Sequence, residues 1–425
     1  MNRIKLLIAF SFLLAANLVQ AQTNVDDFVV NATATVQASP PKITLNWTAS
    51  SAVSYTIFRK LKTEQQFGSA IGTVAGTGST FIDNNVKVGI AYDYLIQKTT
   101  SSYYGFGELD AGIEIPLNDK RGNILLVIDS AIATSITSEL KQYKEDLIGD
   151  GWKVSTVFVS STMKVPAVKS KIAIWYNADK TNNKAAMLIG HIPVPYSGLM
   201  DASNNNDFPP DGHPDHGGAW PTDLYYAEFD GTWTDAGTSV SGLSRTENMN
   251  APGDGKFDQH HLPNDVDIQI GRIDLSSLPI FSKTEKELMQ QYFAKDHQYR
   301  QRLVTVSNRA LICETLGLLG GEAPGRTCSM NFNPLFSSAK TESVSGTKYF
   351  DTLKKKDYLF SAVTSYAGYN TLLSVGAVDR YKDSIHSVFN TTFGSYHGDW
   401  DNSNNMMRGC LGSPGLTLTN VWSGR

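Results

Sequence analysis

The stretch Ser387–Trp400 reads S-V-F-N-T-T-F-G-S-Y-H-G-D-W and decides how the second part of this 425-residue chain is interpreted. Its first half is an apolar, β-branched run that ends at Phe393, which predicts a buried strand. Small and reactive side chains follow at once, among them Ser395, His397 and Asp399. Because α/β enzymes usually place their chemistry where such strands end, the stretch predicts a candidate site centred on Ser395.

Working outward, the chain between Gly122 and Arg425 alternates apolar runs with helical spacing. Strands are predicted at 123–128, 152–158, 185–192, 267–273, 310–313, 359–365 and 388–393, and helices at 134–149, 165–176 and 282–301. Alternation of this kind favours a parallel sheet with helices on both faces. A polar insertion at about 199–263, rich in Asp, Asn, Gly, His and Pro, interrupts the pattern and is long enough to be functional.

The segment 27–117 predicts a separate all-β domain, because short runs of alternating apolar and polar residues are divided by turn residues. An early strand with Trp47 and a late strand with Tyr92 give this segment a pattern that resembles a fibronectin type III domain. In that resemblance Tyr92 is the corner tyrosine and Trp47 belongs to the core. Many unrelated modules share this sandwich, so it implies little chemistry.

The first 21 residues are interpreted as an export signal. Arg3 and Lys5 precede an apolar run, and Val19 and Ala21 supply small residues for cleavage after Ala21. We therefore expect a secreted or cell-surface protein; the alternative is a buried first helix. The apolar run is too short for a membrane span, and no later segment is long and apolar enough, so none is expected.

The net charge limits the kinds of binding partner, and the cysteine content limits the number of disulfides. Removing Arg3 and Lys5 leaves 35 basic residues against 41 acidic ones, a net charge of about −6, which argues against a nucleic-acid partner. Cys313 and Cys328 could pair and leave Cys410 alone, or all three could be buried thiols. The chain stops abruptly at Arg425, so we expect a longer protein whose second domain is truncated here.

Five short motifs follow one another along the second domain. They are Gly190-His191-Ile192-Pro193, Thr222-Asp223-Leu224-Tyr225-Tyr226, Ile270-Gly271-Arg272-Ile273, Tyr366-Ala367-Gly368-Tyr369 and Gly398-Asp399. Their order and spacing over 122–425 resemble the gingipain family of cysteine peptidases. The resemblance implies a caspase-like, three-layer α/β domain with a mostly parallel sheet, preceded by the fibronectin type III-like sandwich.

The resemblance also implies a Cys–His dyad at the ends of two neighbouring strands, where the histidine helps to activate the thiol. Position by position, the histidine turn reads Gly368-Tyr369-Asn370 and the cysteine position falls on Ser395. Neither catalytic residue is kept. We therefore expect a domain without dyad catalysis that binds a protein or peptide ligand or serves as a scaffold, with no cofactor required.

Two other functions stay open. The chain could be a working secreted endopeptidase, with misassigned residues or with Ser395 assisted by His397 and oriented by Asp399; Tyr369 would be a poor base near neutral pH. In the plainer interpretation, His397 and Asp399 hydrogen-bond backbone groups and fix the turn. The chain could also be a cell-surface module whose working part lies beyond Arg425.

The resemblance places Asp223 near a specificity pocket, where it would bind a basic group and Tyr225 would line the cleft. An aspartate that only ties down its loop is equally expected, and Arg272 is expected to be a structural ion-pair partner. Further along, Trp400 is expected to pack over the strand ends while Asp401 caps a helix that starts near Asn405.

The polar insertion supplies candidate metal ligands. Alternating Asp and Gly suit a calcium loop, although the full twelve-residue pattern is absent. The possible calcium ligands are Asp207, Asp211, Asp215, Asp230, Asp254 and Asp258. The unit from His213 to His216 could bind zinc, but the sequence offers no third spaced ligand. A solvated polar loop is the alternative.

Overall fold

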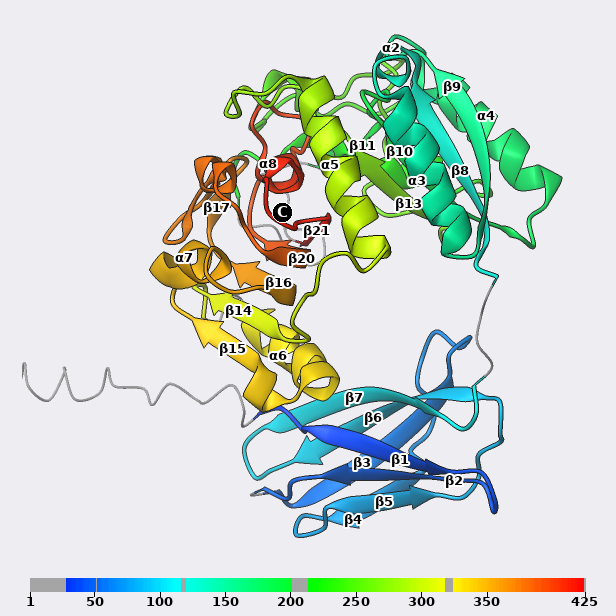
Figure 1. Cartoon of the computed structure of the whole chain (residues 1–425), viewed down its shortest axis with the longest axis vertical. Helices are drawn as coiled ribbons and strands as arrows, with labels where there is room; N and C mark the ends of the chain where they lie inside the picture. The colour runs from blue at the N-terminus through cyan, green and yellow to red at the C-terminus, as the bar shows by residue number, and fades with distance from the viewer. Residues whose placement is uncertain (1–27, 51, 116–119, 201–212, 318–323, 424–425) are drawn as a thin grey trace, which may run out of the picture. The chain divides into compact units, whose positions relative to one another are not determined.

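The computed structural model describes residues 28–50, 52–115, 120–200, 213–317 and 324–423 (Figure 1). Two compact units divide the chain: residues 1–116 with 318–342, and residues 117–317 with 343–425. The expected second domain began at 122, close to this division. Residues 318–342 differ from expectation, because they group with the first unit. Helix α6 (Pro324–Phe336) contacts that unit, where the Arg326 guanidinium lies 3.7 Å from the ring centre of Phe28.

The first unit is the expected antiparallel sandwich. One sheet has the order β1-β2-β5 and the other β4-β3-β6-β7. Their bounds are β1 (Ala32–Gln37), β2 (Lys42–Trp47), β3 (Ser54–Leu61), β4 (Gly72–Ala75), β5 (Thr80–Asp83), β6 (Ala91–Thr99) and β7 (Tyr104–Gly112). Along β6, buried residues alternate with partly exposed ones, as expected of a strand with one face on a core.

Two residues singled out in the sequence have the expected places in this sandwich. Trp47 is buried, and its ring lies 5.1 Å from that of Tyr55. The buried Tyr92 hydroxyl accepts a hydrogen bond of 3.1 Å from the backbone N–H of Lys87, five residues upstream. That backward hydrogen bond is the feature of a tyrosine corner.

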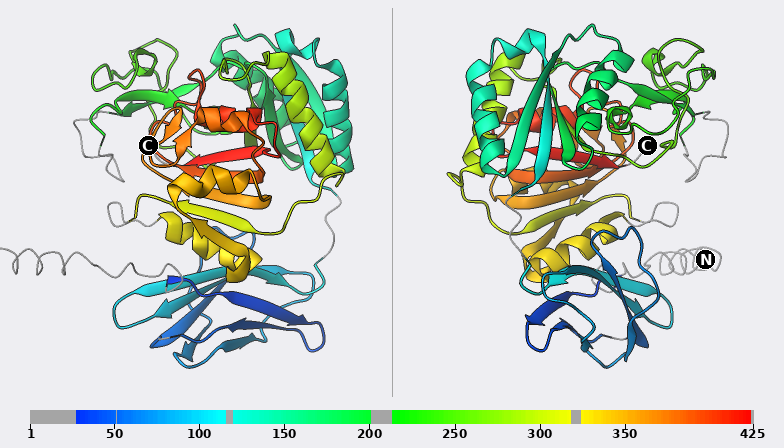
Figure 2. Two further views of the ribbon diagram at one scale, coloured as in Figure 1. Left: turned by 60° about the vertical axis from the view of Figure 1, so that its left-hand side comes forward. Right: turned by 90° about the vertical axis from the view of Figure 1, so that its right-hand side faces the viewer.

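The second unit contains two parallel sheets, seen from two sides in Figure 2. The first has the order β13-β10-β8-β9. Its strands are β8 (Gly122–Asp129), β9 (Trp152–Val159), β10 (Asn183–Ile189) and β13 (Gln269–Ile273), and its helices are α2 (Ser130–Ala133), α3 (Thr137–Gly149), α4 (Val165–Ala178) and α5 (Glu285–Arg300). The helix expected over 134–149 is α3, which starts three residues later than predicted, at Thr137, and the short α2 before it was not expected.

Strand β8 shows why this sheet is covered on both faces. Its residues Ile124, Leu126 and Ile128 belong to the core that includes α3 and α5. Leu125 and Val127 point to a second core, which includes α4. A strand with helices on both sides is apolar at every position, which explains the continuous N-I-L-L-V-I run.

The second sheet has the parallel strands β14, β16, β20 and β21 in this order. They are β14 (Ala310–Glu314), β16 (Tyr358–Thr364), β20 (Ser387–Phe393) and β21 (Thr419–Ser423), with helices α7 (Tyr349–Leu353) and α8 (Met406–Gly412). Strand β15 (Thr341–Val344) spans the division between the two units. The second unit is therefore an α/β domain with parallel sheets, as the strand–helix alternation predicted.

Short elements occupy the connections of the second unit. They are β11 (Tyr196–Met200), β12 (Gly218–Pro221), η2 (Asp223–Tyr226), η3 (Thr246–Asn248), η5 (Gly346–Lys348), β17 (Ala367–Gly368), β18 (Thr371–Leu372), β19 (Gly376–Ala377) and η6 (Val378–Lys382); η4 (Ser338–Lys340) belongs to the first unit. Within the described ranges, no helix has the length and apolar character needed to cross a membrane.

Candidate functional site

The candidate site lies where β16 and β20 end, and these two parallel strands are neighbours in the second sheet. Thr364 pairs with Phe393, and the backbone N–H of Ser365 donates to the Phe393 carbonyl at 3.1 Å. Beyond the strand ends, His397 contacts the Thr371 carbonyl at 3.2 Å. The segment that holds Tyr369 and the turn that holds Ser395 therefore follow adjacent strands, as the resemblance requires of the dyad positions.

The backbone of the turn is tightly constrained. A Cβ atom at Gly394 would lie 2.6 Å from the Cβ of Ala367, so a glycine is needed where the two strand ends approach. Tyr396 has a φ of 63°, a left-handed conformation that costs a residue with a side chain about 1–2 kcal/mol. Backbone strain of this kind persists only where surrounding contacts over-determine the conformation.

Those contacts come from the polar insertion. The Ser395 hydroxyl lies 2.8 Å from Nε2 of His213, and the Tyr396 hydroxyl donates to Asp215 at 2.6 Å. The His213 ring stacks on that of His216, with centres 4.0 Å apart and planes inclined by 11°. Two consecutive turn residues are thus held by two residues of one insertion loop.

The sequence did not predict His213 as a partner of Ser395. The sequence indicated the unit from His213 to His216 only as a possible zinc site. A separation of 182 residues gave no local signal for the contact.

His397 has the plainer of its two expected roles. Its side chain is fully buried, and burial lowers its pKa to about 4, so the ring is neutral at physiological pH. A neutral ring must carry its proton on Nε2 to donate to the Thr371 carbonyl. This proton position makes His397 a fixed donor that holds the turn to the segment after β16.

The Asp399 carboxylate is also bound by other side chains of the chain. Burial raises its pKa to about 6, although the Arg245 guanidinium, 2.9 Å away, opposes that shift. Asn248 donates to the Asp399 carboxylate at 3.4 Å. In the described part of the chain, Ser395 thus contacts His213, while Asp399 is paired with Arg245.

Tyr369 is partly exposed to solvent, and its backbone is held by hydrogen bonds. Its side chain is 40% exposed, and its carbonyl accepts hydrogen bonds from the Met406 N–H at 2.8 Å and from the Asn405 amide at 3.1 Å. Asn405 also caps α8 by accepting from the Met407 N–H at 2.9 Å. The expectation that Asp401 caps this helix was wrong, because Asp401 binds Arg245 at 2.6 Å instead.

A pocket of about 230 Å³ adjoins the Ser395 turn. Gly398 of the turn and His216 of the insertion loop are part of its wall. The remaining lining residues are Ser197, Met200, Trp220, Pro221, Thr222, Leu224, Trp233, Gln259, His260, His261, Leu262 and Trp422. Walls with this many aromatic and aliphatic side chains suit an apolar group, and a few polar atoms can orient it.

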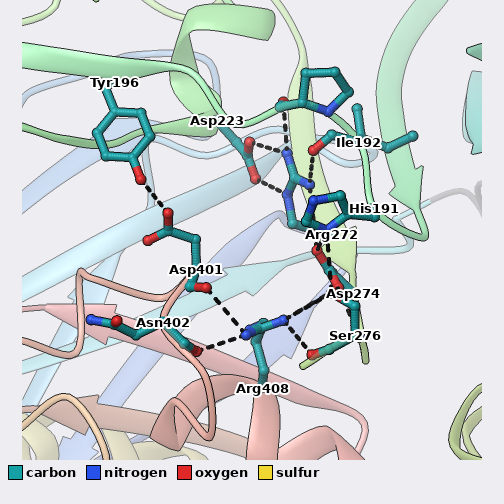
Figure 3. Close-up of polar contacts among 11 residues, drawn as sticks. His191, Ile192, Tyr196, Asp223, Arg272, Asp274, Ser276, Asp401, Asn402 and Arg408 are labelled. Carbon is teal, nitrogen blue, oxygen red and sulfur yellow. Dashed lines mark hydrogen bonds and ion pairs between the residues drawn. The ribbon is translucent and has the colours of Figure 1, made fainter. Parts of the chain in front are cut away.

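Asp223 is tied to Arg272 near the carboxyl ends of the first sheet (Figure 3). Both carboxylate oxygens accept from the Arg272 guanidinium, at 2.7 and 2.8 Å, and Arg272 also donates to the Ile192 carbonyl at 2.7 Å. The guanidinium carbon lies 4.6 Å from the ring centre of Trp400. Asp223 thus has the contacts of an aspartate that ties down its loop, one of its two expected roles, and Arg272 is the ion-pair partner that was expected.

Tyr225 belongs to a core in this structure. Its ring is buried, stacks on Phe257 with centres 4.1 Å apart and meets Trp233 edge-on at 5.1 Å. The cleft-lining position expected for Tyr225 is taken by its neighbour Leu224, which lines the pocket.

The same region contains a buried charge network centred on Asp274 (Figure 3). Arg408 lies 3.3 Å from Asp274, and His191 lies 3.5 Å from it. Burial alone would raise the pKa of Asp274, but the hydrogen bond from His191 and the charges of Arg408 and Arg272 hold it well below its usual range. Nearby, the Tyr196 hydroxyl donates to Asp401.

The possible calcium ligands are scattered. Asp207 and Asp211 lie outside the described residues. Asp215 accepts from Tyr396, Asp230 lies 3.8 Å from Lys180, Asp254 accepts from the Lys256 N–H at 2.9 Å, and Asp258 accepts from the N–H groups of Ala236 and Gly237 at 3.0 Å each. Over the described ranges, no three His, Cys, Asp or Glu residues are grouped to hold a metal ion. Calcium binding stays a prediction, tested by a calcium-dependent rise in melting temperature that chelator reverses.

Two of the three thiols are poorly suited to be a replacement nucleophile. Cys313 and Cys410 are buried, and burial raises the pKa of each to about 12. A thiol with so high a pKa is inert, because the thiolate is the reactive form. Cys313 is a thiol and forms no disulfide with Cys328.

Comparison with solved structures finds proteins of similar fold. The arginine-specific cysteine proteinase gingipain R matches 72% of this chain and 63% of its own, with 12% identity and a TM-score of 0.45. A complex of the Porphyromonas gingivalis RgpB pro- and mature domains matches 71% of this chain and 63% of its own, with 11% identity and a TM-score of 0.46. This chain therefore spans less than two thirds of the length of either structure.

A Fn3-like protein from Clostridium thermocellum matches 20% of this chain and 88% of its own, with 22% identity and a TM-score of 0.17. The expected likeness to gingipains and to fibronectin type III domains is thus found among solved structures, as a likeness of fold alone. No family model matches the chain, and no curated protein matches it.

Proposed function

We propose that this chain is an exported protein that binds a peptide or protein ligand at the pocket beside the Ser395 turn, without cysteine-type catalysis. One observation carries the proposal: a pocket of about 230 Å³ adjoins the turn that holds Ser395. The resemblance to gingipains implies a cysteine at this position, and the chain has a serine. The buried, high-pKa thiols Cys313 and Cys410 support the absence of cysteine chemistry.

The chemistry of the pocket defines the ligand class. Trp220, Trp233 and Trp422 offer aromatic faces, while Leu224 and Leu262 are each 40% exposed and add aliphatic surface. Aromatic and aliphatic walls favour burial of an apolar side chain. Arg272 occupies both oxygens of the nearby Asp223 carboxylate, so this carboxylate is not available to bind a basic residue of the ligand.

A peptide array probed with the full chain tests the binding function. We expect saturable binding of peptides that carry large apolar side chains. Leu224→Glu and Leu262→Glu each place a charge in the pocket and should weaken this binding at least about tenfold, since burying a charge there without a partner is unfavourable.

The matched control is Ile174→Glu on α4, where the side chain is 73% exposed and does not line the pocket. This variant should bind like the original chain. No saturable binding to any peptide, or full binding by both pocket variants, would overturn the proposal.

Export has a separate test. Expression of the full chain in a secreting host should yield a mature protein that begins at Gln22, with the predicted cleavage after Ala21. N-terminal sequencing of the protein in the medium and in the cell fraction measures this directly. Retention of Met1 in all fractions would contradict it.

A further inference from the structure

We propose that Ser395 and His213 form a nucleophile–base pair that hydrolyses carboxylic esters or amides with an apolar acyl group, an activity beyond ligand binding. The two side chains come from the turn after β20 and from the polar insertion, and the Ser395 Oγ lies 2.8 Å from the His213 Nε2. A hydroxyl becomes a useful nucleophile when a base stands within about 2.6–3.2 Å of it. The contact therefore meets the first geometric requirement of a serine hydrolase.

The imidazole is held in place by packing. His216 stacks on one face of His213, and Tyr396 meets it edge-on with centres 5.5 Å apart. Tyr396 is itself held by its hydrogen bond to Asp215 in the same loop. Rotation of His213 would disturb these contacts, so the ring stays directed at Ser395.

The same arrangement gives a substrate access. Ser395 and His213 are both only partly buried, whereas His397 is fully buried. Gly398, three residues after Ser395, and His216, whose ring stacks on that of His213, line the pocket of about 230 Å³. An acyl group seated among Trp220, Trp233 and Leu262 would lie beside the pair, which is why we assign an apolar acyl group.

The reaction balances with these two residues and water. His213 Nε2 accepts the proton of Ser395 as Oγ forms a bond to the acyl carbon, and the resulting tetrahedral intermediate expels an alcohol or amine that takes the proton from His213. Water then attacks the acyl-serine, again giving its proton to His213. The C–O bond to Ser395 breaks, the carboxylic acid leaves, and the serine hydroxyl is restored.

His397 is excluded as the base by its surroundings. Its Nε2 donates to the Thr371 carbonyl, and the whole ring is buried. The plainer interpretation of the Ser395–His213 contact is that it only fastens the loop to the turn. That interpretation predicts a stable site without reactivity, which makes the two distinguishable.

A fluorophosphonate probe tests the proposal on the full chain, with intact mass and peptide mapping as the readout. We expect one covalent adduct, on Ser395. Ser395→Ala should abolish the adduct, and His213→Gln should slow its formation at least about 100-fold, the contribution typical of a general base. His213→Asn is a second variant in case the first fails to fold, and the melting temperature of each reports folding.

The chain offers a matched control in Ser384, whose hydroxyl lies 3.0 Å from Nε2 of His386 at an exposed site. This second Ser–His contact lines no described pocket. Ser384 should stay unlabelled, and Ser384→Ala should leave labelling of Ser395 unchanged. Labelling of Ser384 at the rate of Ser395 would show that contact alone suffices and would overturn the proposal.

Turnover is the second measurement. The chain should hydrolyse p-nitrophenyl esters of apolar acids, and Ser395→Ala should lose this activity. Absence of both labelling and hydrolysis in the folded protein overturns the proposal, as does an unchanged labelling rate in a folded His213 variant. Peptide binding by a chain that is never labelled would leave the proposed binding function standing while this inference fails.

Discussion

The two parallel sheets of the larger unit end in different ways. At the carboxyl ends of the first sheet, acidic and basic side chains such as Asp274 and Arg272 form a buried ionic network. At the carboxyl ends of the second sheet, the partly buried Ser395 and His213 meet through one hydrogen bond. Both ends follow buried strands, and at the first sheet His191 also lies 3.2 Å from Ser276. Among the described residues, it is the turn after the second sheet that adjoins the pocket of about 230 Å³.

The difference between the two sheet ends indicates which polar groups stay available to a ligand or substrate. Charged groups that pair in a buried network are fixed by several partners, and breaking the network is costly. Asp223 and Asp274 are used in this way, so neither is available to a ligand without loss of its partner. A partly exposed hydroxyl and imidazole pay no such desolvation cost, and they can change partners when a substrate enters.

Removal of Asp274 should have the largest effect on stability. Asp274→Ala leaves the buried Arg408 and its neighbour Arg272 without their shared carboxylate. Loss of one partner of a buried ion pair costs about 3–5 kcal/mol, so we expect a decrease of that size in the free energy of unfolding. Chemical denaturation measures it.

The control for Asp274 is Asp351→Ala, which breaks the exposed ion pair with Arg380 at 2.7 Å. Exposed pairs contribute less than about 1 kcal/mol. Equal losses from the two substitutions would contradict the contrast between a buried network and surface pairs.

Acid should weaken the fold through His397. Its pKa falls from 6.5 in the unfolded chain to about 4 in the folded one because of burial. Between those values the unfolded state binds the extra proton, so stability is lost as the pH falls from about 6.5 towards 4. The shift corresponds to about 3 kcal/mol, and His397→Asn should remove this part of the pH dependence in denaturation curves.

Asp399 should act in the opposite direction. Burial raises its pKa from 3.8 to about 6, so in that interval the folded state binds the extra proton. Its contribution therefore favours folding at low pH and is lost as the pH rises through about 6. Asp399→Asn should make the acid loss steeper than in the original chain, and a shallower loss would contradict this assignment.

A methyl group at Gly398 should disturb the end of the second sheet. A Cβ atom there would lie 2.6 Å from the Trp422 ring, so either the backbone at Gly398 or the Trp422 ring must move. Overpacking of this kind costs about 1–3 kcal/mol, and Gly398→Ala should also weaken ligand binding because both residues line the pocket. Thermal unfolding and binding titrations measure the two effects.

Gly149→Ala is the matched control, since a Cβ at Gly149 meets no atom within 4 Å and the residue lies in α3. It should leave stability unchanged or raise it by up to about 1 kcal/mol, because alanine favours helices over glycine. A loss as large as that of Gly398→Ala would argue against the steric explanation.

The smallest expected effect on stability is that of Ser395→Ala. A neutral hydrogen bond contributes about 0.5–1.5 kcal/mol, so the free energy of unfolding should fall by no more than this amount. Unfolding curves measure it. A loss of several kcal/mol would indicate that the Ser395–His213 contact is chiefly a structural fastening and would weaken the contrast drawn between the two sheet ends.

Much of the fold followed from local patterns. The apolar runs predicted β8, β10, β16 and β20 within a few residues, and the helical spacing predicted α4 and α5. Trp47 and Tyr92 marked the sandwich because their environment depends on neighbours in the same short strands. The position of Ser395 at a strand end was predicted for the same reason, since a strand and the turn after it are local features.

Contacts between side chains of different segments were predicted less well. Asp401 was expected to cap α8, but Asn405 does so, because Arg245 engages Asp401. Residues 318–342 were expected in the second domain and group with the first unit, since local sequence patterns do not state which domain a segment packs against. The contact between His213 and Ser395 was not predicted, although the sequence marked each residue as a candidate for a different site.

By itself, the sequence determined the two kinds of architecture, the strand that precedes Ser395 and the serine, in place of a cysteine, after that strand. Periodicity and residue type decide these features within ten or twenty residues. Only the tertiary structure decided that Asp223 is taken by Arg272, that Asp399 is taken by Arg245, and that His213 contacts Ser395 across 182 residues. Such pairings depend on the path of the whole chain, which brings distant side chains together after the local elements have formed.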